Sequence, residues 1–151
     1  MSKISTLHDA IVTKISSNLS SYTQMPNPYS LEENPHPLLV KGFGVSVGAG
    51  VRTDRVIGCQ VSWERTFLIT LINKVTTTDS NTTVRETLTK GILEDHYTLL
   101  KQFEIDGGLS GTAIDGIVTA DSGIELVELD SKQHFLIELE LTVEYLEDLT
   151  S

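Results

Sequence analysis

The chain has 151 residues, 39% of them hydrophobic and 21% charged, with a net charge of −10 at pH 7. These values are typical of one folded domain, residues 1–151, and exclude a disordered chain. Residues 1–75 carry seven basic and five acidic side chains, whereas residues 76–151 carry four and sixteen, which gives net charges of +2 and −12. Because such a field repels phosphates, the composition argues against a protein that grips DNA or RNA.

No apolar run approaches the length of a membrane span, and the N-terminus lacks the basic and apolar parts of a signal peptide. We therefore expect a protein made in the cytosol, with no membrane partner. Cys59 lies among alternating strand residues, which predicts a small buried side chain and not a disulfide. The histidines are scattered without the spacing of metal ligands, so the sequence predicts no metal and no cofactor.

Five apolar residues near the N-terminus recur at steps of three and four: Ile4, Leu7, Ile11, Ile15 and Leu19. This period predicts an amphipathic helix over residues 5–21. The stretch from Thr6 to Asp9 resembles a capping box and marks its predicted start. His8 lies beside the stripe and is predicted to be a partly buried or surface histidine.

A second helical stripe follows a polar linker at residues 76–81: Val84, Leu88, Ile92, His96, Leu99 and Phe103. It predicts a helix over residues 83–103 that begins with a capping box from Thr83 to Glu86. Glu86 and Lys90 form a favourable pair one turn apart. His96, on the apolar stripe, is predicted to be a hydrogen-bonded core histidine.

Residues 22–37 hold all four prolines and predict an extended loop, long enough to be functional or packed on a partner. Residues 39–75 predict a long β-hairpin region. In its first strand, over 39–51, one face is apolar and the other carries glycine at four of five positions. Since glycine in a strand marks a close approach, we expect a helix to lie on that bare face.

The stretch from Arg52 to Arg55 is polar and predicts the turn of this hairpin. Alternation then resumes over residues 57–72, where Arg65 interrupts an otherwise apolar face. An unpaired buried charge is costly. We therefore expect either a β-bulge near Arg65 or an outer part of the hairpin that projects beyond the core.

Residues 106–113 form a glycine-rich loop that is predicted to be mobile and to carry little of the core's stability. It lacks the lysine of a phosphate-binding loop and the glycine spacing of a nucleophile elbow. Strands are predicted at 114–120 and 124–129, joined by a turn at 121–123. With the final strand, residues 114–146 predict an antiparallel β-meander.

The final strand alternates most regularly, with apolar residues at every odd position from Phe135 to Tyr145. Its polar face carries Glu138, Glu140 and Glu144, which predicts a solvated acidic face. The element order predicts an α+β fold, a mostly antiparallel sheet with two main helices packed on one face. No set of residues converges on catalytic chemistry, so the sequence predicts no enzyme.

Three stretches combine with this element order and the size of the chain: the glycine-bearing strand Lys41–Val47, the strand Ser62–Leu71 with its aromatic-charged-charged step, and Phe135–Tyr145. Together they resemble the tail terminator, or tail completion, proteins of long-tailed bacteriophages. The resemblance covers roughly residues 4–146. The proline-rich loop and the length of the hairpin are where this chain departs from the pattern.

The resemblance implies a structural virion protein. Such proteins form a ring, usually a hexamer, on the last ring of the tail tube, where they stop polymerisation and present a surface to the head-side connector protein. Partners would be further copies of the chain, the tail tube protein and the connector, while DNA passes through the ring without specific binding. Assembly would occur in the host cytoplasm, and the protein would reside at the head-proximal end of the tail.

The interaction residues that we predict lie in the loops, at the interrupted face and on the acidic strand: Arg52, Arg55, Arg65, Gly107, Gly108, Ser110, Glu138, Glu140 and Glu144. Two alternatives remain. Another ring-forming phage neck or tail-tube protein would share these features. A small ligand-binding module or enzyme would instead use the glycine-rich loop over residues 106–113.

Overall fold

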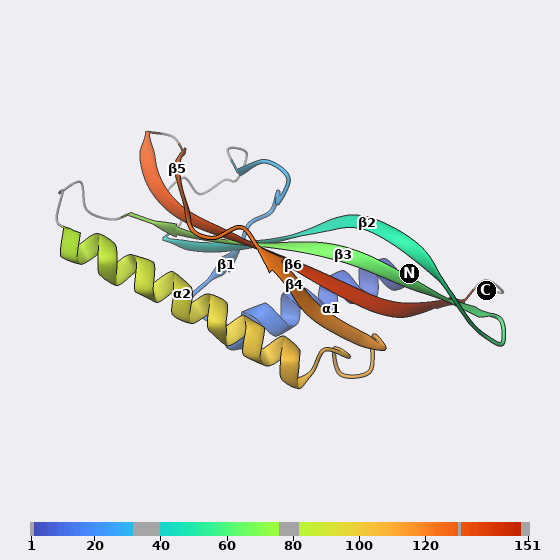
Figure 1. Ribbon diagram of the computed structural model, residues 1–151. Helices are drawn as coiled ribbons and strands as arrows, with labels where there is room; N and C mark the ends of the chain where they lie inside the picture. Colours follow the sequence, from blue (N-terminus) through green and yellow to red (C-terminus); the bar gives the residue numbers. More distant parts are fainter. Residues whose placement is uncertain (1, 32–39, 76–81, 130, 149–151) are drawn as a thin grey trace.

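The computed structural model describes residues 2–31, 40–75, 82–129 and 131–148. Two helices pack on one face of a six-stranded, mostly antiparallel sheet, so the predicted α+β class is confirmed (Figure 1). The elements follow the chain in this order: α1 Lys3–Asn18, β1 Thr23–Gln24, β2 Lys41–Ile57, β3 Gln60–Lys74, α2 Thr82–Ile105, β4 Asp115–Asp121, β5 Glu125–Leu129 and β6 Lys132–Asp148.

Three long strands, β2, β3 and β6, form the centre of the sheet, in the order β1-β2-β3-β6-β4. Only β1 and β2 are parallel among the described strand pairs. The predicted meander is wrong, because β4 and β5 both pair with β6 and lie end to end along one of its edges. The chain does not reverse between β4 and β5 but continues along β6. Ser122 N donates to Glu138 O at 2.9 Å in this connection, and Gly123 takes a φ of 71°.

Both predicted helices are present. The capping box predicted at Thr6 is wrong: α1 begins earlier, because the side chain of Ser2 caps it by accepting a bond from Ser5 N at 3.2 Å. In α2, Lys90 and Glu86 form the predicted pair at 3.1 Å. The predicted linker at 76–81 and the side chain of Thr83 lie outside the described residues.

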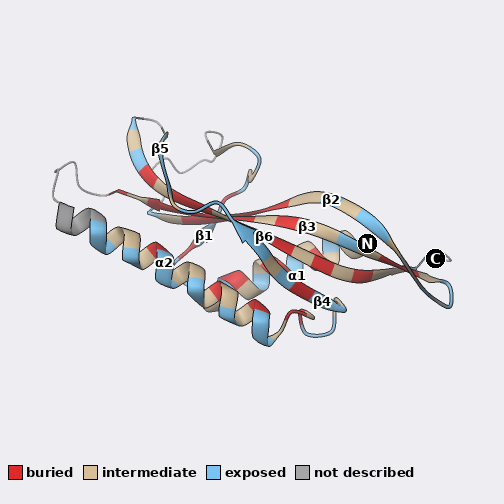
Figure 2. Ribbon diagram, viewed as in Figure 1, coloured by how far each residue is buried: buried red, intermediate tan, exposed pale blue. Residues whose placement is uncertain are grey.

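The main core lies between the sheet and the two helices, and Figure 2 shows its buried residues along both. The alternation predicted for β6 is confirmed, because its odd positions from Ile137 to Tyr145 are buried. They join residues from both helices and from β2 and β3: Leu7, Ile11, Ile15, Phe43, Phe67, Ile69, Leu71, Ile92, Leu99 and Phe103. This helix-covered side of the sheet is called the helix face below.

The opposite side of the sheet is covered over only one end. There Met25, Ile72 and Leu136 form a second, small core. The expectation of a helix over the glycine-bearing side of β2 is wrong. A Cβ on Gly44 would lie 3.0 Å from Pro28 Cβ and 3.2 Å from Met25 Cε, so residues from the proline-rich segment take the place predicted for a helix.

The hairpin turn differs from the prediction. Arg52–Arg55 lie within β2, which runs on to Ile57, and the turn is formed by Gly58, with a φ of 61°, and Cys59. Cys59 is consequently exposed and not buried as predicted. The turn is displaced because a two-residue hairpin loop with positive φ at its first position matches the twist of its strands better than a longer polar turn.

The β-bulge expected at Arg65 is absent from β3, which pairs with β6 without a register shift. The bulge lies instead in β2, between Val47 and Gly50, beside Arg65. The Arg65 guanidinium donates to Gly48 O at 3.0 Å and to the Tyr145 hydroxyl at 3.1 Å, which satisfies a charge on the helix face without a carboxylate. The outer ends of β2, β3 and β6 extend beyond both helices, as also predicted (Figure 1).

Candidate interaction surfaces

The sheet divides into two ends. The covered end comprises residues 41–45, 69–74 and 132–139, where both sides of the sheet are packed. The open end comprises residues 46–57, 60–68 and 140–148 together with β4. There the helices lie on one side only, and the other side is called the open acidic face.

Five carboxylates define the open acidic face. Register places their residues on the side of the sheet that carries no helix: Glu64, Asp115, Glu140, Glu144 and Asp148. Glu138 lies on the same side of β6, at the border of the covered end. Over 60–68 of β3 and 138–148 of β6, the same-side positions hold no lysine or arginine. The solvated acidic face predicted for β6 is thus present, and it extends onto β3 and β4.

Three of these carboxylates lie in one row across the sheet. Glu64 is the direct cross-strand neighbour of Glu144, and Asp115 is the neighbour of Glu144 on its other side. Ser62 donates its hydroxyl to Glu144 Oε1 at 3.1 Å. Like charges directly opposite one another destabilise a sheet, so this row is tolerable only where water screens it. Among the described residues, no group of three His, Cys, Asp or Glu side chains could hold a metal ion.

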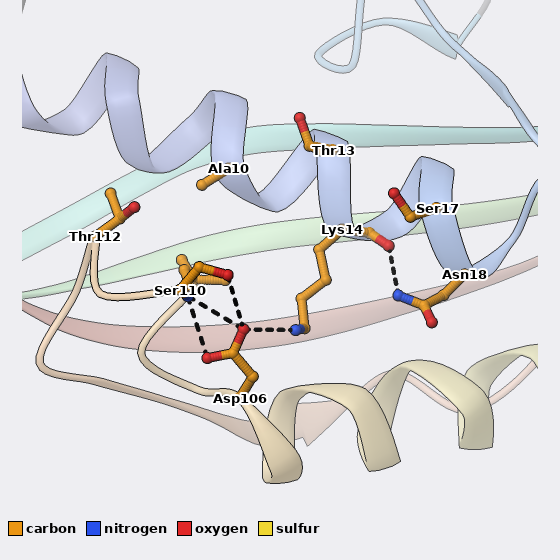
Figure 3. Close-up of a pocket in the computed structure, with 9 residues that line it drawn as sticks. Ala10, Thr13, Lys14, Ser17, Asn18, Asp106, Ser110 and Thr112 are labelled. Atoms are coloured by element: carbon orange, nitrogen blue, oxygen red, sulfur yellow. Dashed lines mark hydrogen bonds and ion pairs between the residues drawn. The ribbon is translucent and has the colours of Figure 1, made fainter.

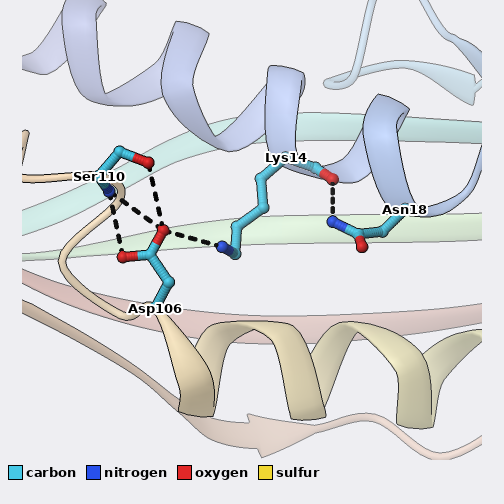
Figure 4. Close-up of polar contacts among 4 residues, drawn as sticks. All are labelled: Lys14, Asn18, Asp106 and Ser110. Atoms are coloured by element: carbon cyan, nitrogen blue, oxygen red, sulfur yellow. Dashed lines mark hydrogen bonds and ion pairs between the residues drawn. The ribbon is translucent and has the colours of Figure 1, made fainter.

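The glycine-rich loop is bound to the rest of the fold. Asp106, which follows α2, accepts bonds from Ser110 N at 3.1 Å and from Lys14 Nζ of α1 at 3.2 Å (Figure 4). Leu109 is 4% exposed and belongs to the main core. The prediction that this loop contributes little to the core is therefore wrong, because leucine at its centre supplies the apolar anchor.

Gly107 has a steric role in this loop. A Cβ there would lie within 3 Å of the backbone of Gly116 in β4, so only glycine permits this approach. Gly108 is tight as well, because a Cβ at that position would lie 3.3 Å from Ala113 O. Gly107 thus positions the loop against β4, Gly108 lets the loop close on itself, and Ser110 is the exposed one of the three.

A pocket of about 410 Å³ opens between α1 and this loop (Figure 3). Lys14 and Asp106 are its charged groups, and hydroxyls of Thr13, Ser17 and Thr112 line it. The Ser110 N–H and the Lys14 ammonium together hold the pKa of the Asp106 carboxyl below its usual range. Because the two charges satisfy each other, the arrangement acts as a clamp between α1 and the loop. The Ser110 hydroxyl also donates to Asp106 Oδ2, at 3.4 Å.

The three predicted arginines lie on the hairpin, away from the glycine-rich loop. Arg52 is exposed near the outer end of β2, and Arg65 is half-buried on the helix face. The side chain of Arg55 lies outside the described residues. The structure does not bring Arg52 or Arg65 onto the face that carries Glu138 and Glu140, so the predicted interaction residues whose side chains are described belong to separate surfaces.

Some polar groups escaped the sequence analysis. The Tyr22 hydroxyl donates to Asp95 Oδ2 at 2.7 Å and accepts from Asn73 Nδ2 at 2.8 Å, a node that joins the proline-rich segment, β3 and α2. Burial raises the pKa of this hydroxyl well above its usual range. No sequence signal links three residues so far apart in the chain.

The histidine predictions are met in part. His8 is half-buried as predicted, with Nε2 3.1 Å from Val45 O. His96 was predicted to be a hydrogen-bonded core residue, but it is half-buried beside β4 and belongs to neither core cluster. Its Nε2 has no hydrogen-bond partner among the described residues and stands 3.6 Å from Asp121 Oδ2. His134 is buried, and burial lowers the pKa of its imidazole.

The sequence matches no protein-family model and no curated protein. Neither α1 nor α2 in its described part is long and apolar enough to span a membrane.

Proposed function

We propose that this protein is a structural protein of a bacteriophage virion that forms a ring on the end of the tail tube. There it stops polymerisation of the tube and provides the surface to which the head-side connector attaches. The observation that carries the proposal is the open end of the sheet, which has helices on one side and the open acidic face on the other.

A ring gives both sides of the open end a role. With the helices outside and the open acidic face toward the channel, the row of Glu64, Glu144 and Asp115 would meet DNA as it passes. Negative charge repels phosphates, so DNA would move through without binding. The helices would then face outward and rigidify the wall of the ring.

The resemblance to tail terminators gains support from the fold. The three stretches that carry it, Lys41–Val47, Ser62–Leu71 and Phe135–Tyr145, fall on β2, β3 and β6, which are neighbours at the centre of the sheet. A likeness spread over separate stretches thus corresponds to one continuous structural unit.

The decisive experiment measures assembly and tube length. Light scattering after size-exclusion chromatography, followed by negative-stain imaging, should reveal closed rings, alone or on the ends of purified tail tubes. Co-assembly with tube protein should shorten the tubes. A chain that stays monomeric at high concentration and does not bind tube ends would contradict the proposal, and a chain that polymerises into tubes by itself would be a tube protein.

The channel assignment has its own test. Glu140→Lys reverses a charge on the open acidic face, and Glu94→Lys makes the same change on the exposed surface of α2. In rings, the first variant should retain DNA at low salt and release it at high salt, because phosphate contacts are screened. Equal retention by both variants would show that the open acidic face does not line the channel.

A further inference from the structure

The outer edge of β2 changes character at Gly48. Before that residue its backbone groups have partners: His8 Nε2 lies 3.1 Å from Val45 O, and Val47 N donates to the Tyr29 hydroxyl at 3.2 Å. From Gly48 onward, no second strand within the described ranges pairs with β2 on this side. A strand edge with no neighbouring strand is a template for another strand.

The opposite edge of the sheet is formed in part by β4, which pairs with β6 alone among the described strands. Beside it an apolar groove of about 370 Å³ separates β4 from α2. Tyr97 and Ile105 are 60% and 69% exposed there, and Val118 of β4 lines the same groove. A free strand edge beside such a groove offers both backbone hydrogen bonds and sites for side chains.

The two edges have compatible directions. Because β2, β3, β6 and β4 are successively antiparallel, β2 and β4 run in opposite directions on the two sides of one sheet. Val51, Glu64, Glu144 and Asp115 form one row across it, so the free part of β2 and the start of β4 also lie at the same level. Copies with a common orientation would therefore meet edge to edge, antiparallel, without a large shift.

We propose that the edge of β2 beyond Gly48 pairs with β4 of a second copy of this chain and so joins neighbouring subunits through a continuous sheet. The inference rests on the proposed function in that a head-to-tail contact of this kind can close a ring. Two different surfaces meet in this contact, the edge of β2 from one copy and the edge of β4 from the next, and every copy carries both.

Side chains on both sides of the sheet match across this contact. On the open acidic face, Val51 is 66% exposed on β2 and Ile117 is 51% exposed on β4. Joining the edges would bring these two apolar side chains together and remove both from water. On the helix face, Arg52 would lie level with Ile114 at the start of β4 of the next copy, on the side where Glu104 stands at the rim of the groove.

Disulfide cross-linking between copies tests the contact directly. In a Cys59→Ser background, Val51→Cys protein is mixed with Asp115→Cys or Ile117→Cys protein and oxidised; both β4 positions share the side of Val51. At least one pair should give a covalent dimer. Glu140→Cys, exposed on the same side but on the central strand, is the matched control and should give none. Rings that yield no β4 cross-link above this control would overturn the inference.

Charge exchange supplies a second measurement. Arg52→Glu and Glu104→Arg should each raise the concentration needed for assembly on the order of tenfold, and combining them in one chain should restore it. The melting temperature of the monomer should stay unchanged in all three. Additive losses, with the combined variant worse than either, would count against this pairing.

The results separate the two proposals. If rings cross-link through β4 but do not bind tube ends, the edge contact is supported and the terminator function is contradicted. If rings cap tubes but give no β4 cross-link, the terminator function is supported and the edge contact is contradicted. A chain that stays monomeric, both free and with tubes, overturns both.

Discussion

The two ends of the sheet use the same three strands differently. At the covered end, both sides are packed, and the edge of β2 is bonded to β1 and His8 and, at Val47 just past this end, to Tyr29. At the open end, one side is a row of carboxylates and both edges lack a second strand among the described residues. The packed residues of the protomer therefore lie at the covered end and on the helix face, and the open end is where we propose that another copy binds.

Core substitution should show the largest difference between packed and open positions. Ile137→Ala removes a side chain that is 1% exposed and should cost about 2–5 kcal/mol in the free energy of unfolding, because it loses transfer energy and leaves a cavity. Ile117→Ala makes the same change at the open edge and should cost well under about 1 kcal/mol in the monomer, measured by urea denaturation. Similar losses would show that β4 is buried in the monomer.

The Tyr22 node should rank second. Tyr22→Phe leaves the buried Asn73 amide without its acceptor, which should cost about 1–3 kcal/mol. Tyr97→Phe, on the exposed surface of α2, is the matched control and should leave the urea midpoint unchanged. If both variants unfold at the same urea concentration as the wild type, Tyr22 does not fasten the covered end.

The clamp at Asp106 should appear as a pH dependence. Its pKa is lowered in the folded state, so its contribution is present above the unfolded pKa near 3.8 and is lost as pH falls through the folded value. The free energy of unfolding should be measured from pH 5 to pH 2, a window of about three units around that value. Over this window it should fall less steeply with decreasing pH in Asp106→Asn than in the wild type. Ser110→Ala should retain most of the slope, because the backbone N–H is the larger cause. Equal slopes in all three proteins would remove the clamp.

The smallest effect should have the opposite sign. Glu64→Gln removes one of two like charges that face each other across β3 and β6, so the monomer should gain roughly 0.2–0.5 kcal/mol. Added salt should reduce the gain, because it already screens the repulsion. A loss of stability at low salt would mean that Glu64 has a favourable partner and that the row is not repulsive.

Periodicity predicted the main elements because burial on one side imposes it directly: β6 alternates, and α2 repeats at helical spacing. The hairpin turn was misplaced because one-sided burial is missing there. A strand that projects into water is polar on both sides, so residues 52–55 look like a turn, whereas Gly58 and Cys59 alone make it.

The pairing of the strands was harder to predict from the sequence than the helices and strands themselves. The segment at 121–123 has turn chemistry, but only the bonds between Ser122 and β6 show that β4 and β5 continue along one edge. The acidic face of β6 could be predicted from residues, while its extension to Glu64 and Asp115 depends on register. A strand edge is free when no other strand lies beside it in the fold. A local sequence pattern does not contain that information.

The central position of β6 has a kinetic consequence. β3 and β6 pair along their full length, although even their closest partners, Lys74 and His134, are separated by about sixty residues. The β2–β3 hairpin and α2 can form from local contacts, but the apolar side of β3 stays without its neighbour until β6 has been synthesised and has closed that long loop. Chains of this kind fold slowly, and their unfinished hairpins are the species most exposed to aggregation.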